Sequence, residues 1–331
     1  MDFRTVVQIP PSDFFIGHGT QLMLFGSCFS ENIGKKLLQN KFSVDVNPFG
    51  ILYNPSSVST AIRRLLRKKV FTENDLVFHN DVYQSFLHHG SFSHTDKQQC
   101  LAQISNRFTK AADSIRKTDV LLITFGTAYV YQLKSDESIV GNCHKFPADR
   151  FSRRRLSVAE ITADWTALIN ELLNVNPQLK VIFTVSPIRH FKDGAHENQL
   201  SKSILHLAIA NLEDRFKANV KYFPAYEIIM DELRDYRFYA SDMLHPSDVA
   251  IEYLWLRFSE TYFSKETQEI IREWITVSQA LQHRPLNGFT ENYLTFLLNT
   301  KEKLNRFSQK YSFISCEEEI DQLNLTLESI K

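Results

Sequence analysis

Cysteine is scarce in this chain. Only four of the 331 residues are cysteines, and they lie far apart without a C-x-x-C pair: Cys28, Cys100, Cys143 and Cys316. Zinc knuckles and disulfide frameworks need closely spaced or regularly repeated cysteines, so the sequence predicts neither. We therefore expect no structural metal and no cofactor.

Long apolar runs and an excess of charge of one sign are also missing. No stretch approaches the roughly 20 apolar residues of a membrane-spanning helix. The N-terminus lacks the basic start and apolar run of a signal peptide. The 38 basic and 38 acidic residues cancel, so the whole molecule does not attract nucleic acid or an anionic membrane. We expect a soluble cytoplasmic protein that binds neither.

Hydrophobic residues, by contrast, are abundant. They make up 43% of the chain, which also contains 26 Phe and 12 Tyr. This much apolar surface offsets the entropy lost on ordering the chain, so we expect a folded globular protein. Its length is long for one compact domain and short for two large ones.

Short apolar runs, rich in β-branched and aromatic residues, predict four buried strands, at residues 22–25, 120–125, 181–185 and 220–223. Apolar residues recur at helical spacing after the first strand, between the later ones, and from residue 247 onward. Strands that alternate with helices pair in parallel through right-handed crossovers. We therefore expect a three-layer α/β/α sandwich with a mostly parallel sheet.

Beyond residue 263 the pattern changes to amphipathic helices. Ile270, Trp274, Val277 and Leu281 share one helical face, and a second helix starts near Tyr293 and leads into the Glu-rich end. We expect a catalytic domain at residues 1–262 and a helical extension at residues 263–331. The extension either packs on the domain or pairs subunits in a homo-oligomer.

Ser27 stands where the first predicted strand meets a helix. Open α/β sheets place ligands at the carboxyl ends of their strands, and the N–H groups at a helix N-terminus favour an oxyanion. A serine nucleophile also needs a base and a group that orients the base. Most serines at such positions are only helix caps, although here we expect Ser30 to be the cap.

A base and an orienting carboxylate follow near the end of the domain. Asp242 lies three residues before His245, so one short loop can hold a ring nitrogen on the carboxylate while the other faces a serine. Taken alone, the pair is more typical of a surface Asp–His contact before a helix. Together with Ser27, in the order Ser–Asp–His, it predicts a catalytic triad.

Residues 26–30 (GSCFS) resemble the signature of the GSCFA family, a divergent branch of the SGNH/GDSL hydrolases. Further matches follow in the family's order, at residues 47–50, 125–128, 142–145, 185–190 and 242–246, and the resemblance spans most of residues 20–310. It implies a sheet of five parallel strands, and hydrolysis or transfer of an acyl group from an ester. It also implies that Ser27 is the nucleophile, His245 the general base and Asp242 the orienting carboxylate.

Two positions depart from the SGNH pattern. Gly26 stands where an Asp precedes the serine, and Ala128 stands where an Asn side chain helps to bind the oxyanion. Loss of one oxyanion donor typically lowers the rate by a factor of about 100 to 1,000. The sequence therefore requires another donor or predicts a weak site.

Five residues are candidates for oxyanion or substrate binding. The Gly50 N–H and the Thr127 hydroxyl, with Gly126 beside it, match the second and third family blocks in order. Asn142 and His144 belong to a polar loop. For these two, pocket lining and ordinary loop hydrogen bonding both remain open.

Other reactive side chains have less specific patterns. Cys28 follows Ser27 and could act as a thiolate at the helix N-terminus, but a buried thiol is the more common role. The histidines at positions 88, 89 and 94 lack a partner at metal-ligand spacing. We interpret them as solvated loop residues.

The sequence thus predicts a serine esterase or acyltransferase that acts on an O-acyl ester, such as an acetyl ester, of a small molecule or a carbohydrate. The alternative is a weak or inactive module that binds an acylated carbohydrate or lipid. The departures from the SGNH pattern at positions 26 and 128 favour this alternative. A third interpretation is an assembly subunit that works through its helical extension. One scaffold serves many chemistries, so the substrate stays open.

Overall fold

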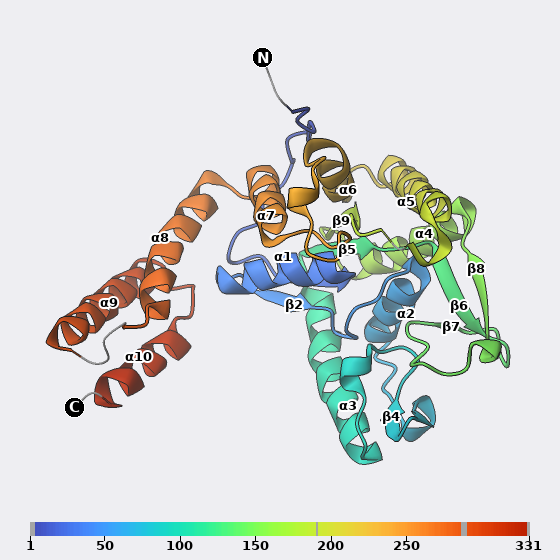
Figure 1. The fold of residues 1–331 in the computed structure, drawn as a ribbon, viewed down its shortest axis with the longest axis horizontal. Coiled ribbons are helices and arrows are strands. Elements are labelled where there is room, and N and C mark those ends of the chain that lie inside the picture. Colours follow the sequence, from blue (N-terminus) through green and yellow to red (C-terminus); the bar gives the residue numbers. More distant parts are fainter. Residues whose placement is uncertain (1–3, 190, 286–289, 330–331) are drawn as a thin grey trace. The chain divides into compact units, whose positions relative to one another are not determined.

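Five parallel strands form the central sheet of the larger of two compact units in this chain (Figure 1). The computed structural model describes residues 4–189, 191–285 and 290–329. The strands of this sheet are β1 (Leu22–Gly26), β2 (Val44–Val46), β5 (Val120–Phe125), β9 (Lys180–Val185) and β10 (Val220–Tyr222). The four predicted strands are confirmed. Strand β2 was missed because three residues are too few for a readable pattern.

The strand order places a reversal beside Ser27. The order is β10-β9-β5-β1-β2, so the chain passes from β1 to β2 on one side and then returns to β5 on the other. Doubly wound sheets bind ligands at the carboxyl ends of the strands where the order reverses. Here β1 ends at Gly26 and β5 ends at Phe125. Ser27 and Gly126 therefore follow the two strands that flank this switch point.

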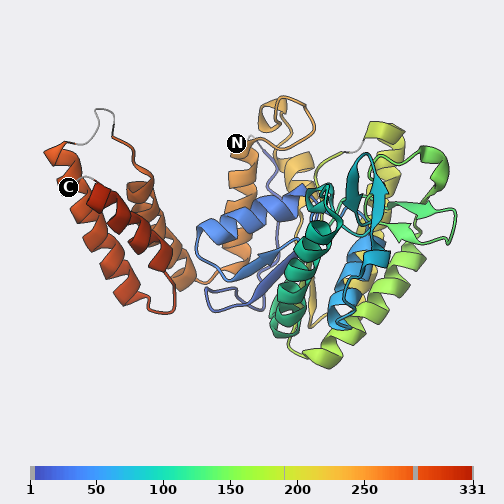
Figure 2. The same cartoon turned by 90° about the horizontal axis from the view of Figure 1, so that it is seen from below.

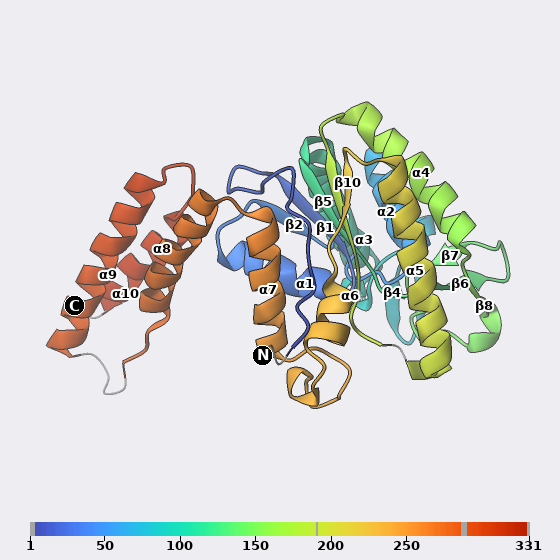
Figure 3. The same cartoon turned by 90° about the horizontal axis from the view of Figure 1, so that it is seen from above.

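Helices cover both faces of the sheet (Figure 3). The helices that bury side chains against one face are α2 (Pro55–Leu66), α3 (Lys97–Ser114), α4 (Val158–Val175) and α5 (Ala195–Arg215). The helices on the opposite face are α1 (Cys28–Gln39) and α7 (Asp248–Tyr262). A short helix, α6 (Ala225–Glu227), follows β10. The predicted three-layer sandwich with a parallel five-stranded sheet is confirmed.

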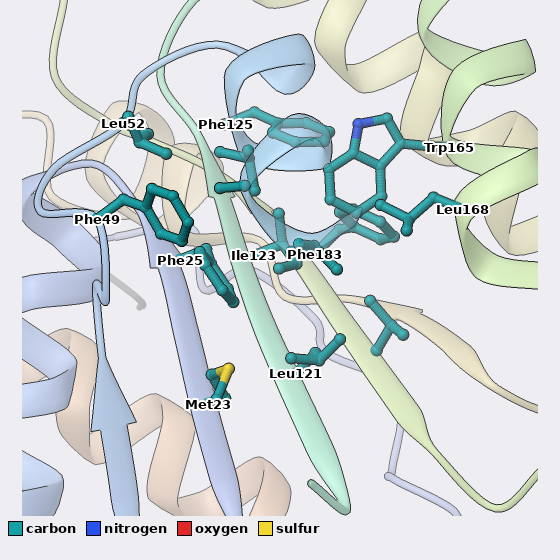
Figure 4. Packing of buried hydrophobic residues seen from close by; sticks show 14 of the residues in the cluster. Met23, Phe25, Phe49, Leu52, Leu121, Ile123, Phe125, Trp165, Leu168 and Phe183 are labelled. Carbon is teal, nitrogen blue, oxygen red and sulfur yellow. The ribbon is translucent and has the colours of Figure 1, made fainter. Parts of the chain in front are cut away.

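An aromatic cluster fills the core between the sheet and helices α2–α5 (Figure 4). Phe125 lies 5.1 Å from Trp165 and 5.4 Å from Phe183, measured between ring centroids. The indole N–H of Trp165 donates to the Pro55 carbonyl at 3.2 Å, so its polar atom is satisfied inside the core. This packing holds the ends of β5 and β9 in place next to the switch point.

Two small antiparallel sheets were not predicted. Their strands are β3 (Val77–His79) and β4 (Val82–Gln84) in one, and β6 (Tyr129–Leu133), β7 (Ile139–Val140) and β8 (Phe151–Arg155) in the other. Between β3 and β4, Asn80 and Asp81 both have left-handed backbone angles, with φ of 50° and 59°. A two-residue hairpin turn requires this conformation. The strands beside it are too short to be distinguished from loop segments in the sequence.

The second unit is helical and has a core of its own. It comprises residues 11–20, 36–43 and 258–331. Its long helices lie side by side (Figure 2): α8 (Lys265–Gln282), α9 (Glu291–Lys310) and α10 (Glu317–Ser329). Trp274 and Phe307 pack in this core, and the Trp274 N–H donates to the Gln39 carbonyl at 2.7 Å.

The helical extension was predicted to start at residue 263, and that domain boundary stays a prediction. Two N-terminal segments, residues 11–20 and 36–43, belong to the same compact unit as the extension. Contacts such as the hydrogen bond from Trp274 to Gln39 connect these segments to the extension. In the part of the chain that the structure describes, no helix has both the length and the apolar character that crossing a membrane requires.

Candidate active site

Ser27 lies between the end of β1 and the start of α1. It is 1% exposed, and its Oγ accepts the Phe29 N–H at 3.4 Å, as the cap of a helix does. Ser30 was expected to be the cap, but it lies inside α1. Its hydroxyl donates to the Phe25 carbonyl at 3.0 Å and lies 2.6 Å from Thr124 Oγ1. The expectation for Ser30 is wrong because the helix already begins at Cys28.

Gly26 has a backbone conformation that only glycine adopts readily. Its φ is 138°, and a Cβ atom at this position would lie 2.2 Å from the Thr124 carbonyl oxygen of β5. The Asn47 side-chain oxygen accepts the Gly26 N–H at 3.0 Å and fixes this turn. The departure from the SGNH pattern therefore has a physical reason. An Asp before Ser27 would collide with the neighbouring strand.

Asp242 and His245 form a hydrogen-bonded pair. The Asp242 Oδ2 atom lies 2.5 Å from His245 Nδ1, and Oδ1 accepts the N–H groups of His245 and Leu244 at 2.9 Å each. The two backbone N–H groups and the imidazole lower the pKa of Asp242 to about 2. The carboxylate is therefore ionised at neutral pH. It favours the tautomer with the proton on Nδ1, which leaves Nε2 to accept one.

The loop that carries this pair is tied down by its own backbone. The Ala240 N–H donates to the His245 carbonyl at 2.7 Å, and the Ser247 N–H donates to the Phe238 carbonyl at 2.8 Å. Met243 turns the chain with a left-handed φ of 58°. These constraints hold the imidazole on a loop of fixed shape, as a general base requires.

A small apolar pocket joins the chain segments that carry Ser27 and His245. Its cavity volume is about 10 Å³, which is room for about one water molecule and far below the usual ligand-site range of about 300 to 1,000 Å³. Its lining residues are Phe29, Asn32, Ile33, Pro187, Ile188, Pro246, Ile251 and Leu254. Phe29 is two residues from Ser27, and Pro246 follows His245. The two segments therefore meet at one hollow, between α1, the end of β9 and the start of α7.

Ser27 and His245 are not directly bonded in this structure. Across residues 4–189, 191–285 and 290–329, no hydrogen bond joins them. The His245 side chain is 49% exposed, whereas Ser27 is buried. The structure pairs the predicted carboxylate with the predicted base. The complete triad stays a prediction.

The expected oxyanion donors are engaged in other hydrogen bonds. The Gly50 N–H donates within its own turn at 2.7 Å, and the N–H groups of Gly126 and Thr127 donate to the Tyr53 carbonyl at 2.7 and 3.0 Å. The Thr127 hydroxyl lies 3.1 Å from Ser201 Oγ. The Gly50 N–H is therefore used in its own turn, and both donor groups of Thr127 are used in contacts with residues distant in sequence.

Asn142 and His144 are committed to a loop. The Asn142 side-chain oxygen accepts the His144 N–H at 2.8 Å, and His144 Nε2 lies 2.8 Å from the Ser85 carbonyl oxygen. His144 is 9% exposed, and burial lowers its pKa. Of the two roles left open by the sequence, these contacts favour ordinary loop hydrogen bonding.

Cys28 and His88 both lie in environments that differ from those of a reactive thiolate and a solvated histidine. Burial raises the pKa of the Cys28 thiol, so this group stays protonated at neutral pH and does not behave as a thiolate nucleophile. His88 was expected to be solvated, which is wrong. It is 1% exposed, and its ring lies 4.7 Å from both Phe49 and Phe71. Among the described residues, no group of three or more His, Cys, Asp or Glu side chains could hold a metal ion.

Lys202 is a buried charged residue at the same edge of the sheet, and the sequence analysis missed it. Its Nζ donates to the carbonyl oxygens of Gly126 and Ser186, both at 2.7 Å, and thus bridges the ends of β5 and β9. Burial, and then the charge of Arg189, lower the pKa of Lys202 to about 7. A lysine among the other polar residues of a helix gives no sequence signal for such a position.

Replacing Lys202 with Met is expected to change how stability depends on pH. The folded-state pKa of about 7 is below the ordinary value of 10.5. Between these values the unfolded chain holds more protons, so the free energy of unfolding of the wild type should rise with pH. Lys202→Met should lack this rise, whereas the surface variant Lys110→Met should keep it. Urea unfolding between about pH 7 and about pH 10 measures the slopes, and equal slopes for wild type and Lys202→Met would contradict the prediction.

Comparison with known proteins identifies the family. Residues 21–258 match the model of the GSCFA family, and residues 274–329 match the model described as GSCFA domain protein, C-terminal domain. This chain belongs to the GSCFA family. The resemblance seen in the sequence is therefore confirmed. No curated protein matches the chain.

Two solved structures share weak similarity with this GSCFA protein. A carbohydrate esterase family 3 protein from Talaromyces cellulolyticus is 10% identical, with 77% of this chain and 99% of that chain covered and a TM-score of 0.34. An acetyl xylan esterase (Est2A) from the rumen bacterium Butyrivibrio proteoclasticus is 10% identical, with 73% and 63% covered and a TM-score of 0.32. Likeness at this level does not extend to function.

Proposed function

We propose that this GSCFA protein is a serine esterase or acyltransferase that acts on an O-acyl ester through Ser27, His245 and Asp242. The observation that carries the proposal is the Asp242–His245 pair, with 2.5 Å between carboxylate and imidazole. It stands on a constrained loop that shares a pocket with the segment following Ser27. The position of Ser27 at the switch point of the sheet supports the same site.

The reaction begins when His245 Nε2 takes the proton of the Ser27 hydroxyl. The serine oxygen bonds to the ester carbonyl carbon, and the carbonyl electron pair moves to its oxygen. Collapse of this tetrahedral intermediate expels the alcohol, which receives the proton from His245, and leaves an acyl-serine. Water, or an acceptor hydroxyl, then releases the acyl group by the same steps in reverse. Asp242 stays ionised throughout and stabilises the imidazolium.

The missing bond between Ser27 and His245 is compatible with this proposal. Catalytic hydrogen bonds are often long in sites without substrate and shorten in the complex. The same observation, together with Ala128 in place of an Asn donor, favours the second candidate, a module that binds an acylated carbohydrate or lipid without turning it over.

A serine-directed fluorophosphonate separates the two candidates. The reagent phosphonylates a serine only where a base activates it, so no knowledge of the substrate is needed. We expect one adduct, on the tryptic peptide that contains Ser27, and no adduct in Ser27→Ala. Ser186 is the internal control. It is also buried at a strand end, and its Oγ also accepts the N–H two residues on at 3.4 Å. An unlabelled Ser27 would leave the binding module as the function.

Substrates of small-molecule or carbohydrate type fit this chemistry. The cytoplasmic location and the pairing of subunits through the C-terminal helices remain predictions of the sequence.

A further inference from the structure

A buried carboxylate closes the base of the loop that carries His245. Glu232 ends the π-helix η6 (Ile228–Glu232), just before this loop, and its side chain is fully buried. Its two oxygens accept hydrogen bonds from Arg257 Nη1 at 3.1 and 2.9 Å, and one of them also accepts the Tyr253 hydroxyl. Tyr253 and Arg257 lie on α7, which follows the loop. These three side chains, which we call the clasp, therefore join the two ends of the loop.

The N-terminal segment completes the clasp. The Val7 N–H donates to Glu232 Oε2 at 3.1 Å, and the Val7 carbonyl accepts Arg257 Nη2 at 2.8 Å. The Arg4 guanidinium lies 5.2 Å from the centre of the Tyr253 ring. A buried carboxylate needs a charged partner and hydrogen-bond donors. Glu232 has both inside the molecule.

Stability alone is a poor explanation for charges at this place. Removal of two charges from water costs free energy, and apolar residues of similar volume often give equal or greater stability. A buried ion pair can instead specify one register between the elements that it joins, because a slipped helix leaves both charges unpaired. Here the pair connects η6 to α7.

The widened turn of η6 also sets the direction of Glu232. The Leu233 N–H donates to the Ile228 carbonyl at 2.9 Å, five residues back, where an α-helix would bond four residues back. One extra residue in a turn rotates the side chains that follow by about 100°. Turns of this kind are frequent at functional sites.

The register of α7 affects the candidate site directly. Ile251 and Leu254 of α7 line the pocket between the segments of Ser27 and His245, and His245 lies shortly before α7 begins at Asp248. A shift of one residue along an α-helix moves a side chain by about 1.5 Å along the axis and turns it by about 100°. The helix that carries two members of the clasp therefore also carries part of the pocket wall.

We propose that the clasp of Glu232, Tyr253 and Arg257 positions the loop of His245, so that the imidazole meets Ser27 in the reacting complex. The inference rests on the proposed function. The three side chains are positioning residues, because they act through His245 and not on the substrate. A misplacement of about 1 Å can lower the rate by a factor of about 100.

The test is Glu232→Gln, which keeps the length of the side chain and removes its charge. We expect kcat for an aryl ester to fall about 100-fold, with KM nearly unchanged. Asp164→Asn is the matched control, because Asp164 also accepts a hydroxyl, from Ser59, and a guanidinium, from Arg63, at 2.5 Å each. Asp164 joins α4 to α2 and not the ends of the loop. Its replacement should leave kcat within a few-fold of the wild type.

A double-variant cycle with Asp242→Asn distinguishes positioning from loss of stability. If the clasp acts through the base, the double variant should lose less kcat than the product of the two single losses. A purely structural role lowers only the fraction of folded protein, so the two factors multiply in full. Tyr253→Phe removes only the hydroxyl bonded to Glu232 and should show the same coupling with a smaller loss. It carries the test if Glu232→Gln does not fold.

The outcomes separate this inference from the function beneath it. If Glu232→Gln keeps the wild-type kcat, or if its loss multiplies in full with that of Asp242→Asn, while Ser27→Ala is inactive, the positioning role is refuted and the esterase stands. If Ser27→Ala remains active, the proposed function itself fails.

Discussion

Replacement of Ser27 by alanine is expected to abolish hydrolysis of a short-chain aryl ester such as 4-nitrophenyl acetate. The serine oxygen is the atom that bonds to the acyl carbon. The neighbouring Cys28 thiol is a poor replacement, because burial raises its pKa and keeps it protonated. In serine hydrolases, loss of the nucleophile lowers kcat by a factor of about 10⁶. Release of nitrophenol, compared with the rate in buffer alone, is the measurement.

The structure offers a close control for this variant. Ser27 also caps α1, so Ser27→Ala should cost about 1 kcal/mol of stability, and reduced folding must be separated from lost chemistry. Ser186→Ala removes a hydroxyl that is equally buried and makes the same local hydrogen bond. We expect Ser186→Ala to retain activity. Equal activities of the two variants would refute Ser27 as the nucleophile.

Replacement of Asp242 by asparagine is expected to lower kcat by about 10⁴, as it does for the corresponding change in serine proteases. The Asn oxygen can still accept the N–H groups of Leu244 and His245, so the loop should keep its shape. The amide NH₂ group cannot accept the proton on His245 Nδ1. The imidazole would then present a protonated Nε2 to Ser27, which cannot act as a base.

The control for Asp242 is another capping carboxylate on the same loop. Asp235 accepts the Arg237 N–H at 2.9 Å, and no histidine among the residues that the structure describes is bonded to it. Asp235→Asn should therefore leave kcat within a few-fold of the wild type. The measurement is the steady-state kcat of both variants. If Asp242→Asn is as active as Asp235→Asn, Asp242 has no role in orienting the base. Because the pKa of Asp242 is about 2, the carboxylate remains ionised across the neutral and mildly acidic range used for such assays.

Much of this fold can be predicted from the sequence, because the spacing of apolar residues indicates which side of each strand or helix is buried. The run at residues 120–125 and the helical face over residues 158–173 each encode which side of an element is apolar. Alternation of such elements then leaves a parallel sheet as the way to bury them all. The spacing of Asp242 and His245 likewise predicts a pair that can meet on one loop, and the pair does meet.

The local geometry of the candidate site was not readable in this way. Gly26 differs from the family pattern because β5 approaches to within 2.2 Å of where a Cβ would stand. The Gly50 N–H looked like a donor but is used in a turn. Lys202 carried no motif, yet it is buried beneath the strand ends and bridges β5 and β9.

The sequence alone therefore determined the class of fold, the family and the candidate nucleophile, base and carboxylate, since these depend on residue type and on spacing along the chain. Only the tertiary structure decided which donors are already engaged and which side chains stand beside Ser27. The physical reason is that a buried backbone N–H needs a hydrogen-bond partner, and for Gly126 and Thr127 that partner is far away in sequence. The spacing of apolar residues does not indicate which residue it is.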